Sequence, residues 1–377
     1  MGAGTARGGA CLLISGNVRK NMEFVVFAGV LLLLFIFMIV QELIQTKNQE
    51  KLFKKYLREN YGKEPPKEYS LERFARLGSY LERHKEEKQL DDITWNDLGM
   101  DEVFRRIDRT YSAAGEEYLY YTLRNISCGR EAMEHLEEVV NWLQEQEDIK
   151  VRIQLLMKRL GHLGKYSLYD YLDNLDYLGE RSNRKIVLGN LLYLPFLLLL
   201  FVQPAMGTIG IVLCMLWHIM TYFREKKVIE PYIISFAYVL RLIDVCEELE
   251  KQKIPVYRRE LDELREVLKS LRELRRGSYW VMAGNQGKIG GNPLDILADY
   301  LRMILHLDIF QFNRMLEKLR KKTGQVETML AITGYLDMAI SVGGFRKSLE
   351  GYCIPKLEED TEKAFLHMKK GWHPLSS

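Results

Sequence analysis

The residue types that most often carry out catalysis form no recognisable motif in this sequence. The seven histidines are scattered, and the segments that begin at His84 and His135 lack the second histidine of a zinc-binding H-E-x-x-H helix. No G-x-S-x-G nucleophile motif occurs. The five cysteines include no C-x-x-C pair, which argues against a disulfide framework or a zinc ribbon and favours a reducing compartment. We therefore expect neither a catalytic site nor a metal site in this chain.

A loop that could hold nucleotide phosphates is also missing from the sequence. The pattern G-x-x-x-x-G-K-[ST] occurs nowhere, because Gly287-Lys288 is followed by Ile289. Two acidic runs, Glu116-Glu117 and Glu358-Glu359-Asp360, lie in highly charged helical segments, and we interpret them as solvated helix faces. The chain is thus expected to bind no cofactor of its own.

Basic residues remain as candidates for contact with phosphate. The candidate contacts to a DNA backbone form two groups: Arg272, Arg275 and Arg276, and then Arg314, Lys318, Arg320, Lys321 and Lys322. Such clusters bind nucleic acid by releasing counterions. The alternative is a solvated helix face whose cations interact favourably with the C-terminal end of the helix dipole. Because the net charge of the chain is only +3, any DNA contact would be local.

The elements that would position these residues include membrane segments. Phe24–Val40 is uncharged and long enough to cross most of a hydrocarbon core of about 30 Å, and no A-x-A cleavage pattern follows it. We interpret 24–40 as a retained transmembrane anchor. Residues 1–23 form an N-terminal extension that need not be translated, with Met22 as the alternative start, and the intact mass of the natural product distinguishes the two starts.

A second apolar region, 186–223, contains no Asp, Glu, Lys or Arg and is interrupted at Gln203–Thr208. It predicts a transmembrane helical hairpin, and the alternative is a re-entrant or buried core hairpin. Basic residues flank it on both sides, which places both of its ends in the cytoplasm by the positive-inside rule. These residues are Arg181, Arg184 and Lys185 before it and Arg224, Lys226 and Lys227 after it. We expect a multi-pass protein of the bacterial inner membrane with the bulk of the chain cytoplasmic.

The remaining segments are predicted to be helical, so the fold class is mainly α. We expect a charged helical linker over 41–91, a first helical part over 92–185, long helices over 224–283, a second helical part over 284–350 and a connector over 351–377. In the third of these segments Leu261, Leu264, Leu268 and Leu271 follow a/d spacing. This stripe indicates a helix-on-helix seam within the chain or, alternatively, a dimerising coiled coil.

Three separated segments resemble parts of the MutS family. IDRTYSAAGEEYLYYTLR, over Ile107–Arg124, is similar to the start of the MutS core domain, and LAITGYLDMAIS, over Leu330–Ser341, is similar to its last core helix. GWHPL, over Gly371–Leu375, resembles the element that precedes the family's ATPase domain. The resemblance covers roughly residues 92–375 and is closest to membrane-anchored bacterial MutS-related proteins. The positions that carry it are Asp108, Thr110, Gly115, Leu336, Asp337, Ser341, His373 and Pro374.

Some of these positions also have a physical interpretation of their own. Thr110 can cap the following helix, and Gly115 permits two helices to pack closely. The resemblance gives His373 a structural or nucleotide-adjacent role, and a plain turn histidine is the alternative. No Phe-x-Glu mismatch-reading element occurs in the sequence.

The resemblance implies a MutS-core and lever-like domain of long helices, with the anchor before it and the hairpin inserted into it. Such a chain would transmit the nucleotide state of a MutS-like mismatch-repair-family ATPase, would act as a homodimer, and would contact membrane lipid and the DNA backbone. ATP and Mg²⁺ would belong to an ATPase domain that this sequence does not contain, so the chain itself would not be an enzyme. The alternative is a membrane scaffold that kept the MutS-like helices but binds neither DNA nor nucleotide.

Overall fold

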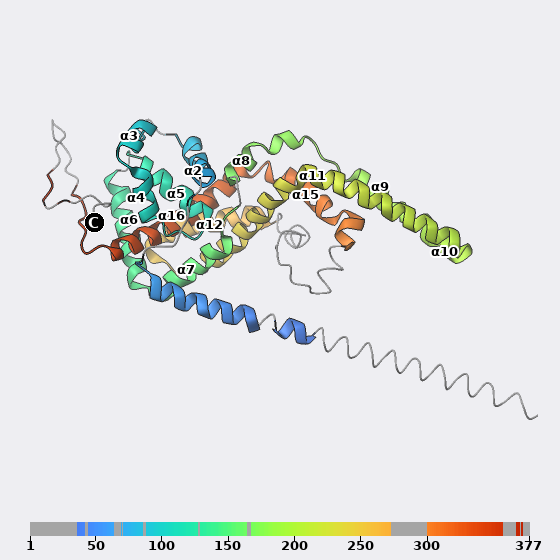
Figure 1. Ribbon diagram of the computed structural model, residues 1–377, viewed down its shortest axis with the longest axis horizontal. Helices are drawn as coiled ribbons and strands as arrows, with labels where there is room; N and C mark the ends of the chain where they lie inside the picture. Colours follow the sequence, from blue (N-terminus) through green and yellow to red (C-terminus); the bar gives the residue numbers. More distant parts are fainter. Residues whose placement is uncertain are drawn as a thin grey trace, which may run out of the picture. The chain divides into compact units, whose positions relative to one another are not determined.

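The computed structural model describes residues 36–41, 44–63, 69, 71–85, 88–126, 129–163, 167–272, 300–356, 367–369 and 371 (Figure 1). The chain divides into two compact units, Met1–Tyr56 and Leu57–Ser377. In the first unit, residues 36–41 and 44–56 are helical. Ile36–Val40 is the end of the expected anchor, and its apolar side chains are exposed. The rest of that anchor and the N-terminal extension lie outside the described residues.

The second unit is built from helices. Their bounds are α2 (Leu71–Arg83), α3 (Asp92–Asp97), α4 (Met100–Ile107), α5 (Ala113–Arg124), α6 (Arg130–Glu145), α7 (Glu147–Leu160), α8 (Leu168–Asp173), α9 (Arg184–Leu191), α10 (Tyr193–Val202), α11 (Pro204–Glu250), α12 (Arg258–Leu271), α15 (Leu307–Leu319) and α16 (Thr323–Ser348), with short 3-10 turns at Leu175–Leu178 and Pro255–Tyr257. Among the described residues the only β pairing is one isolated bridge between Gln89 and Asn125. The expected mainly α class is confirmed.

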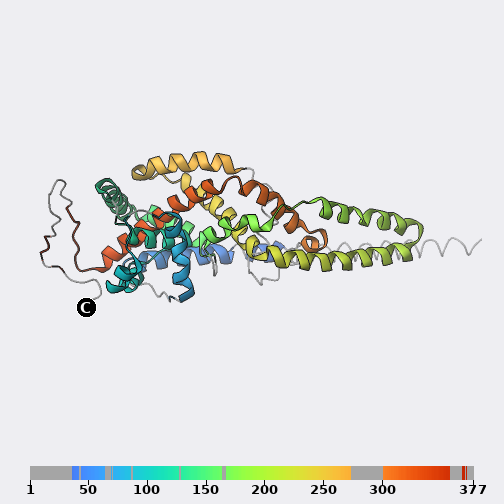
Figure 2. The same cartoon turned by 90° about the horizontal axis from the view of Figure 1, so that it is seen from above.

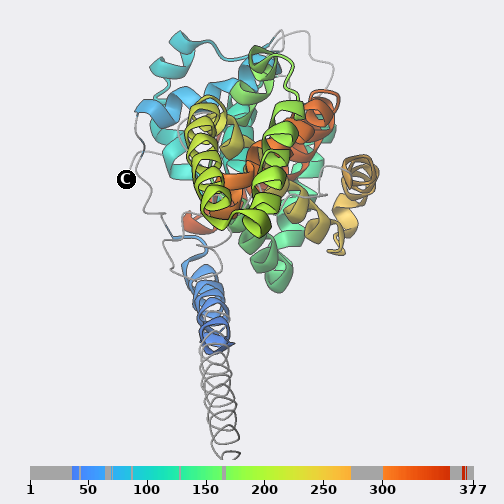
Figure 3. The same ribbon diagram turned by 90° about the vertical axis from the view of Figure 1, so that its right-hand side faces the viewer.

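Among the described residues, three helical spans are long and apolar enough to cross a membrane: Arg184–Val202, Pro204–Glu230 and Thr323–Ser348. Their environments differ: within the most apolar 18-residue stretch of each span, 6% of the first, 28% of the second and 72% of the third is buried inside the protein. The apolar surface of Thr323–Ser348 is therefore covered by protein, which makes α16 a core helix. The other two spans expose their apolar side chains and form the expected hairpin, whose arms run side by side (Figures 2 and 3).

The two arms of the hairpin pack closely because glycines lie where they meet. A Cβ atom built on Gly210 would lie 2.1 Å from a ring carbon of Phe196, and one on Gly207 would lie 2.6 Å from the backbone nitrogen of Leu200. Small residues at such positions are how helices approach one another in a lipid environment, where no hydrophobic effect drives them together. The break between the arms is shorter than the expected Gln203–Thr208, since α10 ends at Val202 and α11 already begins at Pro204.

Helix α11 continues far beyond the expected end of the hairpin at residue 223. It runs unbroken for 47 residues, so the expected segments 186–223 and 224–283 share one helix. Neither the charged run that begins at Arg224 nor Pro231 ends the helix. A proline removes only one hydrogen bond from the ladder and bends a helix that its surroundings support. Beyond Pro231, side chains such as Phe236 and Leu242 are fully buried in the core.

The core of the second unit lies around α16. This helix packs against α5, α6, α7, α11 and α12, and most of its side chains from Val326 to Gly344 are buried. Leu261, Leu264 and Leu271 of α12 are buried in the same core, so the leucine stripe is a seam within the chain. Helix α2 packs against α5 with Leu77 fully buried, so the folded body includes residues that we expected in the 41–91 linker.

Candidate functional site

Four carboxylates from distant parts of the sequence are buried where α5 meets its neighbours. They are Asp108, Glu116, Glu117 and Asp337, none more than 3% exposed, and we call them the acidic junction. Asp108 ends α4, the two glutamates lie in the first turns of α5, and Asp337 lies in the middle of α16. Because a buried carboxylate is costly unless it is paired or hydrogen-bonded, the surrounding donors determine whether this arrangement is stable.

Asp337 ties the start of α5 to α16. Its carboxylate accepts hydrogen bonds from the backbone nitrogen of Tyr111 at 3.0 Å, from that of Ser112 at 2.8 Å and from the Ser112 hydroxyl at 2.6 Å. The carboxylate approaches α5 closely only because residue 115 is glycine: a Cβ atom there would lie 2.4 Å from Oδ2 of Asp337. The expected close approach at Gly115 is thus confirmed.

A second set of hydrogen bonds joins the end of α4 to α16. The Ser341 hydroxyl donates to the carbonyl oxygen of Ile107 at 2.8 Å and accepts from the backbone nitrogen of Arg109 at 2.7 Å. Thr110 does not cap α5 as we expected. Its backbone nitrogen and hydroxyl both donate to Asp108, and Ser112 is the capping residue, accepting from the Gly115 nitrogen at 3.1 Å. Ser112 and not Thr110 caps the helix because the hydroxyl of Thr110 is already bonded to Asp108.

Glu116 and Glu117 are not solvated, which corrects our interpretation of this acidic pair. Glu116 is fully buried and is paired with Arg73 and, at 3.0 Å, with Arg76, both from α2. The Ser167 hydroxyl lies 2.9 Å from both carboxylate oxygens of Glu117. Burial raises the pKa of Glu117 to about 8, against the opposing effects of Ser167 and Arg76. Charge composition alone misplaced this pair because their partners on α2 and α8 are distant in sequence.

The acidic junction ties several helices together. Each of its carboxylates is engaged by backbone, hydroxyl or guanidinium donors of the same chain. Within the part of the chain that the structure describes, no group of three or more His, Cys, Asp or Glu residues is arranged to hold a metal ion. Of the resemblance positions, Asp108, Thr110, Gly115, Asp337 and Ser341 meet here, and Leu336 is buried beside them in α16.

Two of the candidate DNA contacts are engaged by backbone carbonyl oxygens. Arg320 donates to the carbonyl oxygens of Leu175 at 2.7 Å and Gly179 at 3.0 Å, and Lys322 donates to that of Ser270. These two side chains therefore stabilise the fold. Lys318 is half-buried, whereas Arg272, Arg314 and Lys321 are exposed. Arg275, Arg276, His373 and Pro374 lie outside the described residues.

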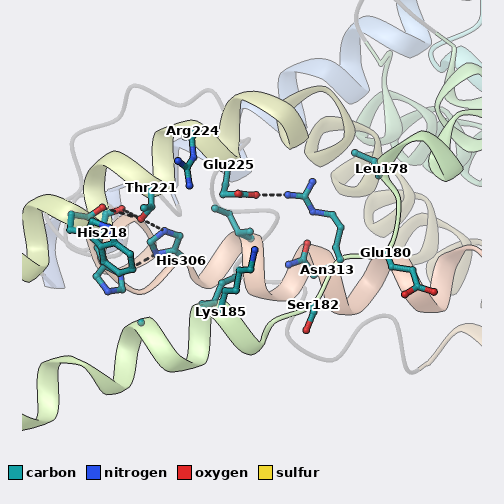
Figure 4. Close-up of a pocket in the computed structure, with 15 residues that line it drawn as sticks. Leu178, Glu180, Ser182, Lys185, His218, Thr221, Arg224, Glu225, His306 and Asn313 are labelled. Carbon is teal, nitrogen blue, oxygen red and sulfur yellow. Dashed lines mark hydrogen bonds and ion pairs between the residues drawn. The ribbon is translucent and has the colours of Figure 1, made fainter.

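A cavity of about 410 Å³ lies at the base of the hairpin, where α9, α11 and α15 converge (Figure 4). Arg181, Lys185, Arg224 and Glu225 line it together with His218 and His306. Arg181, Lys185 and Arg224 were expected only as the basic residues that flank the hairpin, and neither histidine nor Asn313 was expected at a site. No local pattern marks them, since His218 is in the apolar segment and the other two are in α15 or beside it. Only the convergence of the helices brings them together.

Replacing Asp337 by Asn tests the tie between α5 and α16. The amide keeps one acceptor oxygen but turns an N–H donor toward the Tyr111 and Ser112 donors, so unfolding should become easier by about 2–4 kcal/mol. The free energy of unfolding is measured by urea titration of the detergent-solubilised chain, followed by far-UV circular dichroism. The matched control is Asp97→Asn on the exposed end of α3, with an expected change below about 0.5 kcal/mol. Equal losses in the two variants would show that the Asp337 carboxylate carries no special share of stability.

Glu117 should make the protein less stable as the pH rises. Its folded-state pKa of about 8 exceeds the ordinary glutamate pKa of 4.5, so the folded chain retains a proton that the unfolded chain releases. Stability is therefore highest at the low end of this window and falls as pH rises from about 4.5 to about 8. In Glu117→Gln this component is absent, and its urea midpoint should depend less on pH than that of the wild type. Parallel pH profiles for the two proteins would refute this assignment.

Comparison with known proteins gives no assignment: no protein-family model matches the chain, and no curated protein or solved structure matches it either.

Proposed function

We propose that this chain is the core and lever portion of a membrane-anchored MutS-like ATPase, in which it transmits nucleotide state between a catalytic domain and the membrane. The observation that carries the proposal is α11, a single helix that begins in the exposed hairpin and ends inside the core. A helix of this kind couples movement at one end to movement at the other, because its backbone hydrogen bonds resist bending. ATP and Mg²⁺ would be bound by the ATPase domain and not by this chain.

The acidic junction supports the same proposal. The first two MutS-like segments are more than two hundred residues apart, yet Ser112 of one donates directly to Asp337 of the other. This contact joins the start of the core to its last helix, and α16 also packs against α11. A change in the position of α16, which leads toward the expected ATPase domain, would therefore reach the hairpin through packed helices.

In the proposed arrangement both ends of the hairpin face the cytoplasm of a bacterial inner membrane, where DNA is accessible, and two chains act together as a dimer. The exposed residues Arg272, Arg314 and Lys321 are then the described candidates for DNA-backbone contact. A second candidate function is a membrane scaffold without DNA or nucleotide binding. The engagement of Arg320 and Lys322 with backbone carbonyls favours this alternative, because it removes cations from the expected DNA-contact group.

DNA binding by the full chain in nonionic detergent distinguishes the two functions. A fluorescently labelled duplex is titrated at several salt concentrations and its anisotropy is measured. The transmitter function predicts binding that weakens steeply with salt, and Arg314→Ala with Lys321→Ala should reduce the slope of log K against log salt by about two. The control, Arg152→Ala with Lys158→Ala on the exposed face of α7, should leave the slope unchanged.

Negligible DNA affinity at low salt would contradict DNA contact and support the scaffold. Equal losses in the two double variants would contradict the assignment of the contact to Arg314 and Lys321. The ATPase part of the proposal is tested by reading the gene beyond the codon for Ser377. An in-frame G-x-x-x-x-G-K-[ST] supports it, and a stop codon with no ATPase encoded nearby contradicts it.

A further inference from the structure

The cavity at the hairpin base lies at the depth where a membrane-spanning hairpin meets water. Lys185 belongs to the first turn of α9, the start of one apolar span, and Arg224 follows the uncharged stretch of the other. Trp217, which also lines the cavity, is 51% exposed on α11. Tryptophan is enriched at the boundary between lipid and water, where its ring contacts both environments. The cavity is therefore placed at the level of phospholipid headgroups.

The charges around the cavity are suited to a phosphate. Figure 4 shows Lys185 and Arg224 reaching into the same space from α9 and α11. Arg181 also lines the cavity but is paired with Glu225 at 2.5 Å, which fixes that guanidinium and neutralises it. Glu180 adds one exposed carboxylate at the edge of the cavity. Lys185 and Arg224 are exposed and supply the positive charge available to an incoming anion.

Buried polar groups in the same cavity would bind the neutral part of a headgroup. Asn313 is 7% exposed, and its amide nitrogen donates to Asn183, while its carbonyl oxygen is buried without a hydrogen-bond partner. The Nε2 atom of His218 is also buried without a partner. Burial and, to a smaller extent, the neighbouring His218 lower the pKa of His306 to about 4, so His306 is neutral at physiological pH. An unpaired acceptor such as the Asn313 oxygen calls for a hydroxyl or ammonium donor.

We propose that this cavity binds the headgroup of an anionic phospholipid, with the phosphate between Lys185 and Arg224 and a headgroup hydroxyl donating to Asn313. Basic pockets between membrane helices on the cytoplasmic side bind anionic headgroups for this electrostatic reason. A lipid held here contacts α9, α11 and α15 at once and so stabilises the junction of hairpin and core. The proposal requires the hairpin to lie in a membrane but depends on neither DNA nor nucleotide binding.

The test measures binding of single lipids to the full chain in nonionic detergent by native mass spectrometry. Because such a micelle carries no surface charge, general attraction to an anionic membrane is absent. Phosphatidylglycerol should bind in preference to phosphatidylcholine, and Lys185→Ala with Arg224→Ala should weaken the binding of phosphatidylglycerol by about tenfold. The matched control is Arg184→Ala with Lys227→Ala, which removes two neighbouring exposed cations that do not line the cavity. It should change the affinity by less than about twofold.

Equal losses in the two double variants would overturn the site, because they would indicate attraction to net charge. The absence of any preference for phosphatidylglycerol in the wild type would overturn the choice of an anionic lipid. Competition with soluble glycerol phosphate distinguishes a lipid phosphate from a soluble phosphate ester. If millimolar glycerol phosphate competes with an affinity equal to that of the lipid, the lipid assignment is overturned in favour of a soluble phosphate ester.

Asn313→Ala should weaken the binding of phosphatidylglycerol more than that of phosphatidic acid, which has no headgroup hydroxyl beyond its phosphate. An equal effect on the binding of both lipids would contradict the role of Asn313.

Discussion

Backbone hydrogen bonding in an apolar environment is the constraint on which the rest of this structure depends. Within lipid each N–H and C=O group must find a partner in the same segment, so an apolar stretch of this length becomes helical. Once α11 forms in the hairpin, nothing in the sequence ends it at the end of the apolar stretch. Charged residues after Phe223 are good helix formers, and Pro231 removes one hydrogen bond without supplying a cap. The helix therefore continues to Glu250 and carries the hairpin into the core.

The acidic junction solves a different problem, which is how to hold long helices in one register. Apolar packing alone tolerates small sliding of one helix past another, whereas charge-assisted hydrogen bonds are short and directional. Asp337 accepts from Tyr111 and Ser112, and Ser341, one turn later in α16, engages Ile107 and Arg109. Arg73 and Arg76 from α2 compensate Glu116. Removing one member leaves its partners unsatisfied in a buried site, which is why such networks are sensitive to single substitutions.

Hydrophobic patterning predicted the helical class, the hairpin arms and the seam of α12 correctly, because each depends on residues close together in sequence. The environment of Glu116 and Glu117 was not predictable in this way, since their partners lie on α2 and α8. The capping residue of α5 was predicted two positions too early, because Thr110 and Ser112 are both suitable caps. The choice depends on the distant Asp337, which binds the backbone of Tyr111 and Ser112. The cavity residues Lys185, Arg224 and Asn313 come from three helices, and composition gives no indication that they converge.

The central claim is that α11 acts as one continuous element between the hairpin and the core. Spin labels at Met220→Cys and Glu248→Cys test it most directly, by electron–electron double resonance on the chain in lipid nanodiscs. Both labelled positions are exposed. So that the label reacts only there, Cys11, Cys128 and Cys353 are changed to serine. Cys214 and Cys246 are buried and are kept. At about 1.5 Å per residue the account predicts one narrow distance distribution near about 42 Å, shortened slightly by a bend at Pro231. A broad distribution, or two populations of which one is much shorter, would contradict it.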